Sequence, residues 1–332
     1  MNIDSIKIRF PIDCLHEFRE SAFDTIQTDS MQFHDTKIQY KLTAKKPLGM
    51  KDIVLNQTQG YATLEMSAKI LKENYFKLIN GNTIENVFEN VNASGLIQLD
   101  VNNVIETADV LRCDVTTDLH TKDIKQHLRS LSVFRLNQKY ECKMFPSSIA
   151  FNRNVATKGL KEYQTFYCKE TDMRRKDAEL LKYVSIDEAK NVLRCESRYA
   201  NFQQLRTAAE TTDLSLLSIL QSEANPNLKL FNRITQDIEV SDYTNIQNFK
   251  QLIDMKQTFK HRDIQKEIAM FSILKMCNHD IELVKVYLAT NSTANNSRLL
   301  KQFKSRLKAK NDFENRITDA NIDEIRTLLN VA

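Results

Sequence analysis

The chain has 332 residues, of which 42% are hydrophobic and 27% are charged, and it contains only five glycines and four prolines. A chain of this length and composition can bury one or two cores, which excludes a disordered protein and favours a compact, partly helical one. The net charge of +4 is too small to indicate nucleic-acid binding by itself, so the clustering of lysine and arginine matters more.

The six cysteines are scattered and form no C-x-x-C pair, so we expect free thiols rather than a zinc site or a disulfide framework. The N-terminal residues lack a charged segment followed by an apolar one, and no apolar run is long enough to span a bilayer. We therefore expect a cytoplasmic protein without a membrane partner.

Alternating apolar and polar residues predict strands through the first 200 residues. The strands are expected at residues 3–10, 32–44, 52–56, 61–66, 104–118, 138–144, 148–152, 163–169 and 192–199. Helical spacing predicts helices at 83–90 and 121–131, and residues 172–177 read as a charged connection. The predicted fold class is α+β, with a central, mostly antiparallel sheet.

Beyond residue 200 the periodicity becomes helical. Helices are expected at 202–211, 214–222, 246–255, 263–276, 281–288, 297–310 and 321–329. We therefore predict two domains, an α+β domain at residues 1–210 and a helical C-terminal domain at residues 211–332.

The expected helix at 297–310 is basic over its whole length and has no acid. Its cations include Arg298, Lys301, Lys304, Arg306 and Lys308. With the helix at 281–288 and the polar turn between them it resembles a helix-turn-helix, which predicts contact with DNA phosphates. Ordinary helical packing with a basic surface is the alternative.

Several predicted strands place polar and charged side chains on one face of the sheet. These residues are Glu65, Asp114, Tyr167, Lys169 and Glu196. A solvated outer face is the ordinary reading of such a pattern. Carboxylates in the middle of strands, however, are also ligands for Mg²⁺ or Mn²⁺, and a tyrosine becomes a nucleophile when a cation lies close to it.

Two near copies of one motif strengthen the interpretation as a site. In Leu111 to Asp114 and in Leu193 to Glu196 a carboxylate follows Leu-Arg-Cys, so Arg112 and Arg194 precede the acids and are candidates for DNA contacts. Alternation alone puts Tyr163 and Tyr167 on the same side of their strand and does not choose between them. None of the six histidines forms a His-x-His pair, and His127 is expected either to face the site or to lie on a surface.

These residues resemble the gene II/X family of replication initiators from filamentous phages. The resemblance is carried, in order, by the segments 3–11 (IDSIKIRFP), 64–69 (LEMSAK), 111–116 (LRCDVT), 126–129 (QHLR), 166–169 (FYCK) and 193–198 (LRCESR). It covers most of the first 200 residues, and the chain is shorter than the phage enzymes.

The resemblance implies a nicking endonuclease fold and a rolling-circle strand transferase that acts in the bacterial cytoplasm. In this family the tyrosine of a Tyr-x-Lys motif attacks the scissile phosphate, which places the nucleophile at Tyr167 and its lysine at Lys169. The family's acidic positions fall on Asp114, Glu196 and Glu65, with Mg²⁺ or Mn²⁺ as the expected cofactor. The expected partners are origin DNA, single-stranded or supercoiled, and a host polymerase and helicase.

Two other functions remain open from the sequence. The first is a non-catalytic protein of phage or plasmid replication that only binds DNA or single-stranded DNA. The second is a metal-dependent nuclease that uses water, with Tyr167 in a structural role.

Overall fold

The computed structural model describes residues 1–29, 36–133, 140–153, 162–235, 273, 277, 284–288, 300, 301, 303 and 322–331. Two compact units divide the chain. The first comprises residues 1–132, 136–236 and 324–332, and the second comprises residues 133–135 and 237–323. The first unit contains the sheet and is described below.

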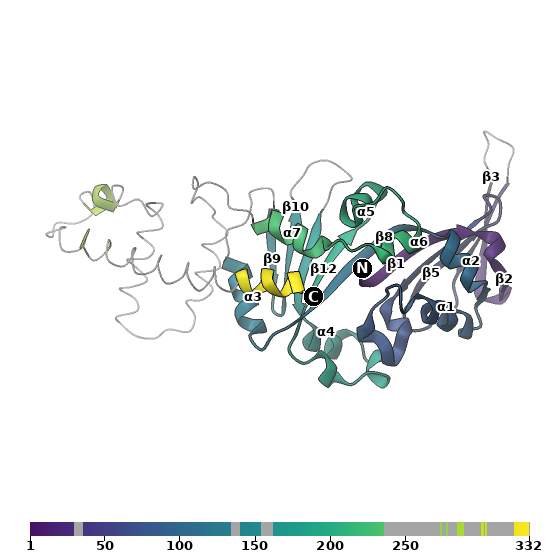
Figure 1. The fold of residues 1–332 in the computed structure, drawn as a ribbon, viewed down its shortest axis with the longest axis horizontal. Coiled ribbons are helices and arrows are strands. Elements are labelled where there is room, and N and C mark those ends of the chain that lie inside the picture. Colours follow the sequence, from purple (N-terminus) through teal and green to yellow (C-terminus); the bar gives the residue numbers. More distant parts are fainter. Residues whose placement is uncertain are drawn as a thin grey trace. The chain divides into compact units, whose positions relative to one another are not determined.

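Ten strands form one sheet in which every neighbouring pair runs antiparallel (Figure 1). Their order across the sheet is β3-β4-β5-β6-β1-β8-β12-β11-β10-β9. The strands are β1 (Ile3–Pro11), β3 (Phe23–Asp29), β4 (Thr36–Leu42), β5 (Met50–Asn56), β6 (Tyr61–Ser67), β8 (Asp109–His120), β9 (Tyr140–Phe145), β10 (Ser148–Arg153), β11 (Tyr163–Cys168) and β12 (Val192–Tyr199). A separate pair joins β2 (Leu15–Phe18) to β7 (Ile97–Leu99).

The α-helices lie between and after these strands. They are α1 (Ile84–Ala93), α2 (Val101–Thr107), α3 (Ile124–Val133), α4 (Lys169–Lys176), α5 (Phe202–Ala209), α6 (Leu216–Gln221) and α7 (Pro226–Thr235). A ten-residue 3₁₀ segment, η3 (Ala68–Lys77), follows β6 directly. Residues 322–331 are also helical. The predicted α+β class, with a large antiparallel sheet and helices toward the C-terminus, is therefore confirmed.

One face of the sheet is mostly apolar because apolar residues predominate at every second position of the central strands. Ile6, Ile8, Cys113, Cys195 and Phe166 are all 1% exposed or less. Helix α7 packs on this face, where its Phe231 ring meets the Phe166 ring edge-on at 5.5 Å. Figure 1 shows α5 and α7 on one side of the central strands and α4 on the other.

The opposite face carries polar residues at the matching positions. Tyr167 lies opposite Arg194 in the β11–β12 register, and Arg194 lies opposite Asp118 in the β12–β8 register. Segments η3 and α4 approach this face, because Tyr75 of η3 and Lys169 of α4 both contact residues on it. The polar face is thus partly covered, and its central side chains are buried.

Three local predictions need correction. The strand expected from residue 104 begins at Asp109, because residues 101–107 form helix α2, whose start is capped by the side chain of Asp100. The charged connection expected at 172–177 lies largely in helix α4. Lys169 is the first residue of that helix and not the last of the strand, so it is not in extended alternation with Tyr167.

The division at residues 210 and 211 into two domains stays a prediction. The start of α6 and helix α7 contact the sheet: Val110 N of β8 donates to Leu214 O, two residues before α6, at 2.9 Å, and Asn227 Nδ2 donates to Thr117 Oγ1 at 2.9 Å. Much of the predicted helical domain lies outside the described residues.

Candidate active site

The proposed nucleophile Tyr167 contacts one of the predicted acids directly. Its hydroxyl donates a hydrogen bond of 2.5 Å to Glu196 Oε1 on the neighbouring strand β12. Both side chains are partly buried. Burial and the adjacent Glu196 raise the pKa of Tyr167 well above its ordinary value, so the phenol carries its proton at rest.

The pKa of Glu196 lies near neutral pH, where the carboxyl can take up and release a proton. Burial, and next the charge of Asp4, raise its pKa to about 7. Among the described acids of this cluster, Glu196 is the one without an ion pair, because Asp4, Asp114, Asp118 and Asp172 all face a lysine or an arginine. Its carboxylate is therefore free to accept the phenolic proton.

Lys169 supplies a cation beside the phenol although it starts a helix. Its side chain is 2% exposed, and its Nζ lies 5.7 Å from the centre of the Tyr167 ring and 5.0 Å from that of Tyr75. Nζ also lies 3.7 Å from Asp172 Oδ2. Burial, and next Arg194, hold the pKa of Lys169 below its ordinary value. Tyr167 and Lys169 are therefore close together as predicted. They are close because Tyr167 lies at the end of β11 and Lys169 lies in the first turn of α4, not because both lie on one strand.

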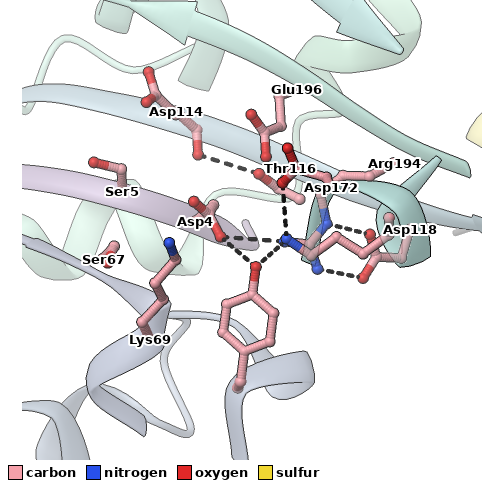
Figure 2. Close-up of polar contacts among 12 residues, drawn as sticks. Asp4, Ser5, Ser67, Lys69, Asp114, Thr116, Asp118, Asp172, Arg194 and Glu196 are labelled. Carbon is pink, nitrogen blue, oxygen red and sulfur yellow. Dashed lines mark hydrogen bonds and ion pairs between the residues drawn. The ribbon is translucent and has the colours of Figure 1, made fainter. Parts of the chain in front are cut away.

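Arg194 is the centre of the polar network shown in Figure 2. Its side chain has no exposed area, and two of its nitrogens bind the two oxygens of Asp118 at 2.6 and 2.7 Å. The third nitrogen donates to Asp4 Oδ1 at 3.2 Å and to the Tyr75 hydroxyl at 2.6 Å. Because its guanidinium is buried, Arg194 cannot make the surface contact to DNA that its sequence position suggested, and we reassign it to holding Asp4, Asp118 and Tyr75 in place.

Asp4 is a site residue that alternation missed. In regular alternation Asp4 would lie on the apolar face with Ile6 and Ile8, but the pairing of β1 with β8 shifts register between Ile3 and Ser5. A bulge of this kind turns one side chain toward the other face. In Figure 2 Asp4 lies among Lys69, Arg194 and Asp114 on the polar side. Burial alone would raise the pKa of Asp4, but Arg194 and Lys169 hold it below its ordinary value.

The remaining predicted acids lie in other contacts. Asp114 binds the guanidinium of Arg198 through both oxygens, at 2.9 and 3.3 Å. Glu65 Oε1 lies 3.6 Å from Arg112, which is itself partly buried. The structure thus brings Tyr167, Lys169 and Glu196 together, but places Asp114 and Glu65 in separate ion pairs.

The predicted metal ligands Asp114, Glu196 and Glu65 do not form one ligand set. Within the described residues no three His, Cys, Asp or Glu side chains are grouped as a metal ion requires. The three predicted ligands are therefore not grouped among the described residues, and a site for Mg²⁺ or Mn²⁺ stays a prediction.

Tyr163 and His127, the two other residues that the sequence allowed in the site, lie in different contacts. Tyr163 lies opposite Arg198 in the β11–β12 register, and the Arg198 guanidinium is 5.7 Å from the centre of its ring, so it faces the Asp114 pair and not Glu196. The His127 side chain is fully buried and lies 3.2 Å from Glu324. Neither residue contacts Tyr167.

The predicted basic helix mostly lies outside the part of the chain that the structure describes. Arg298, Lys304, Arg306 and Lys308 are not among the described residues, whereas Lys301 is described and exposed. DNA binding by this segment therefore stays a prediction. In the described part of the chain no helix is long and apolar enough to cross a membrane.

Comparison with known families gives one match. Residues 80–218 match the family model for the N-terminal part of a replication-associated protein, the gene II type of filamentous phages. No curated protein and no solved structure matches the chain. The matched segment includes β8, β11 and β12, and with them Asp114, Tyr167, Lys169 and Glu196.

Proposed function

From the similarity of residues 80–218 to the gene II-type replication proteins, which supports a rolling-circle replication initiator, we infer that this chain nicks one strand of a replication origin and becomes covalently attached to it. The observation that carries this proposal is the hydrogen bond from the Tyr167 hydroxyl to Glu196, with Lys169 beside the same ring. A phenol, a proton acceptor and a cation are the groups that phosphodiester transesterification by tyrosine needs.

In the proposed reaction the Tyr167 oxygen attacks the scissile phosphorus while its proton passes to Glu196. A bond forms between phosphorus and the phenolic oxygen, and the bond from phosphorus to the 3′ oxygen of the preceding nucleotide breaks. The leaving 3′ oxygen takes up a proton from water, so the products are a 5′-phosphotyrosyl link and a free 3′-hydroxyl from which a polymerase can extend. Because one ester replaces another, the link keeps the energy needed to rejoin the strand.

Two buried cations assist this step by their position. Lys169 lies next to the phenol and stabilises negative charge as it develops on the phosphate. Arg194 does not contact the substrate but fixes Asp4, whose charge keeps the proton affinity of Glu196 high. The raised pKa of Glu196 thus depends on residues of β1, β8 and η3 as well as on those of its own strand β12.

A requirement for Mg²⁺ or Mn²⁺ stays part of the proposal as a prediction. Since the three predicted ligands do not converge, its test is direct: nicking is measured after chelation and after return of either ion. Interactions with a host polymerase and helicase, and action in the bacterial cytoplasm, are likewise proposed from the replication role.

The covalent step is tested with internally labelled circular DNA and 3′-end-labelled single-stranded DNA of the replicon that encodes the protein. We expect an adduct that survives denaturing electrophoresis and disappears in Tyr167→Phe. Tyr163→Phe is the matched control, because it removes a hydroxyl from the same face of the same strand and should leave the adduct intact. An adduct that persists in Tyr167→Phe would refute the assignment, and DNA binding without any adduct would instead favour a non-catalytic binding protein.

A further inference from the structure

A pocket lined by lysines adjoins the candidate active site. Its volume is about 290 Å³, and it lies between the loop before β5, the end of β6, the start of η3 and the end of α4. Four lysines line it, Lys46, Lys51, Lys69 and Lys176, against two carboxylates, Asp177 and Glu179. Asp52 and Asp172 pair with Lys46 and Lys176 from outside the lining, and Lys69 pairs with Asp177. Lys51 instead contacts a hydroxyl, so its charge is available to a phosphate group.

The pocket opens beside the nucleophile's network. Lys51 Nζ donates to Ser5 Oγ at 2.6 Å, and Ser5 pairs with Ser67 across strands β1 and β6. Figure 2 shows Lys69 extending toward Asp4, with Ser67 beside it. Lys51 and Lys69 are both close enough to lower the pKa of Asp4, after the larger effects of burial, Arg194 and Lys169. Asp4 thus interacts electrostatically both with these two lysines and with Glu196, which places the pocket next to the network around Tyr167.

One wall of the pocket is fixed by backbone contacts. Gly49 has φ +84°, and a Cβ added to it would lie 2.2 Å from the backbone nitrogen of Ile70. Its carbonyl oxygen accepts a hydrogen bond of 2.7 Å from Ser67 N. Only glycine permits this approach, so the loop that carries Lys46 and leads into Lys51 of β5 is held against the first turn of η3.

Asp177 gives the pocket a carboxylate oxygen that can accept a hydrogen bond from an N–H group. Its side chain is 3% exposed, and its Oδ1 is paired with Lys69. Its Oδ2 is buried and has no hydrogen-bond partner among the described residues. A buried carboxylate oxygen without a donor is costly, and a bound ligand that brings an N–H group would satisfy it.

We propose that this pocket binds one nucleotide of the DNA strand next to the scissile phosphate, with its phosphate at Lys51 and Lys69 and the amino group of its base at Asp177 Oδ2. Cytosine presents an amino donor at the position where thymine presents a carbonyl oxygen, so the carboxylate accepts from the first and repels the second. The pocket would thus give the nicking reaction a base preference. The choice of DNA as the ligand rests on the proposed function.

The test measures binding of fluorescein-labelled oligo(dC) and oligo(dT) of equal length by fluorescence anisotropy. The full chain carries Tyr167→Phe, so that no adduct forms and the result does not depend on nicking. We expect oligo(dC) to bind about fivefold or more tighter than oligo(dT), and Asp177→Asn to remove this difference. If the protein with Asp177 intact binds the two oligonucleotides equally, the proposal is overturned, whatever Asp177→Asn does. That result would not bear on the adduct at Tyr167, which is tested separately.

The proposed phosphate contact has its own measurement. Lys51→Met should weaken both oligonucleotides alike and lower the salt dependence of binding by about 0.7 in the log-log slope, which is the effect of removing one phosphate contact to a single strand. Lys190→Met is the matched control, since Lys190 pairs with the exposed Asp187 and lines no part of this pocket. An unchanged slope in Lys51→Met, or the same decrease in Lys190→Met, would show that the pocket does not hold the phosphate.

Discussion

The nicking rate should report the protonation of Glu196. The pKa of this carboxyl is raised from 4.5 to about 7, first by burial and then by the charge of Asp4. Only the ionised carboxylate can take the phenolic proton, so the rate should fall about tenfold for each pH unit below 7 and level off above it. The same raised pKa means that the contribution of Glu196 to folding stability is full below pH 4.5 and is lost as the pH rises through about 7.

The effect of Asp4 on the pKa of Glu196 is tested with the substitution Asp4→Asn. The amide oxygen can still accept hydrogen bonds from Arg194 and Tyr75, but the negative charge next to Glu196 is gone. The pKa of Glu196 should therefore move down from about 7 toward 4.5, and the inflection of the rate profile should move to lower pH with it. Because burial is the larger cause, the shift should be partial.

The assay is single-turnover adduct formation with a labelled origin strand, at pH values from about 5 to 9. Asp187→Asn is the control, because Asp187 is an exposed acid paired with Lys190 and should leave the profile unchanged. An inflection that stays in place in Asp4→Asn would show that Asp4 does not set the proton affinity. A flat profile in the unaltered protein would refute the role of Glu196 as proton acceptor.

Three further outcomes are expected. Glu196→Gln should slow adduct formation by ~10²–10⁴, with little change in DNA affinity measured by anisotropy, because only proton acceptance is removed. Arg194→Met should lower the free energy of unfolding by about 3–5 kcal/mol in a denaturant titration, since it leaves Asp4 and Asp118 buried without their cation. Joint replacement of Lys301, Lys304 and Lys308 by methionine should lower affinity for double-stranded DNA and reduce its log-log salt slope by roughly 0.9 for each phosphate that the helix no longer neutralises, and an unchanged slope would remove this helix from the interface.

The sheet was predictable where one face of a strand is apolar over its whole length. Strand β6 has Ala62, Leu64 and Met66 buried in strict alternation, so its position and its orientation both follow from the sequence. Strand β12 likewise buries Leu193 and Cys195. Alternation cannot, however, give the order of ten strands, because it says which face a residue takes and not which strand lies next to it.

The candidate site was predictable only in part, because two of its residues depend on departures from regular structure. Asp4 reaches the polar face through a bulge, and the sequence signal for it was an acid at an otherwise apolar position, next to Ile6 and Ile8. Lys169 was expected on the strand of Tyr167, but the chain turns into α4 after Cys168 and returns the lysine to the same ring. The pairing of Asp114 with Arg198 needs the β8–β12 register, which no local pattern contains.

The ion pairs of this site explain why Glu196 differs from its neighbours. Arg194 pairs with Asp118 and Asp4, and Arg198 pairs with Asp114, so each of these carboxylates faces a fixed cation. Glu196 lies between those two arginines along β12 and is opposite Thr116 of β8. Its carboxylate accepts a hydrogen bond from the Tyr167 phenol and has no cation as partner among the described residues. Glu196 binds a phenol and not a cation, and burial and the charge of Asp4 raise its pKa to about 7, which supports the proposal that the proton passes between Tyr167 and Glu196.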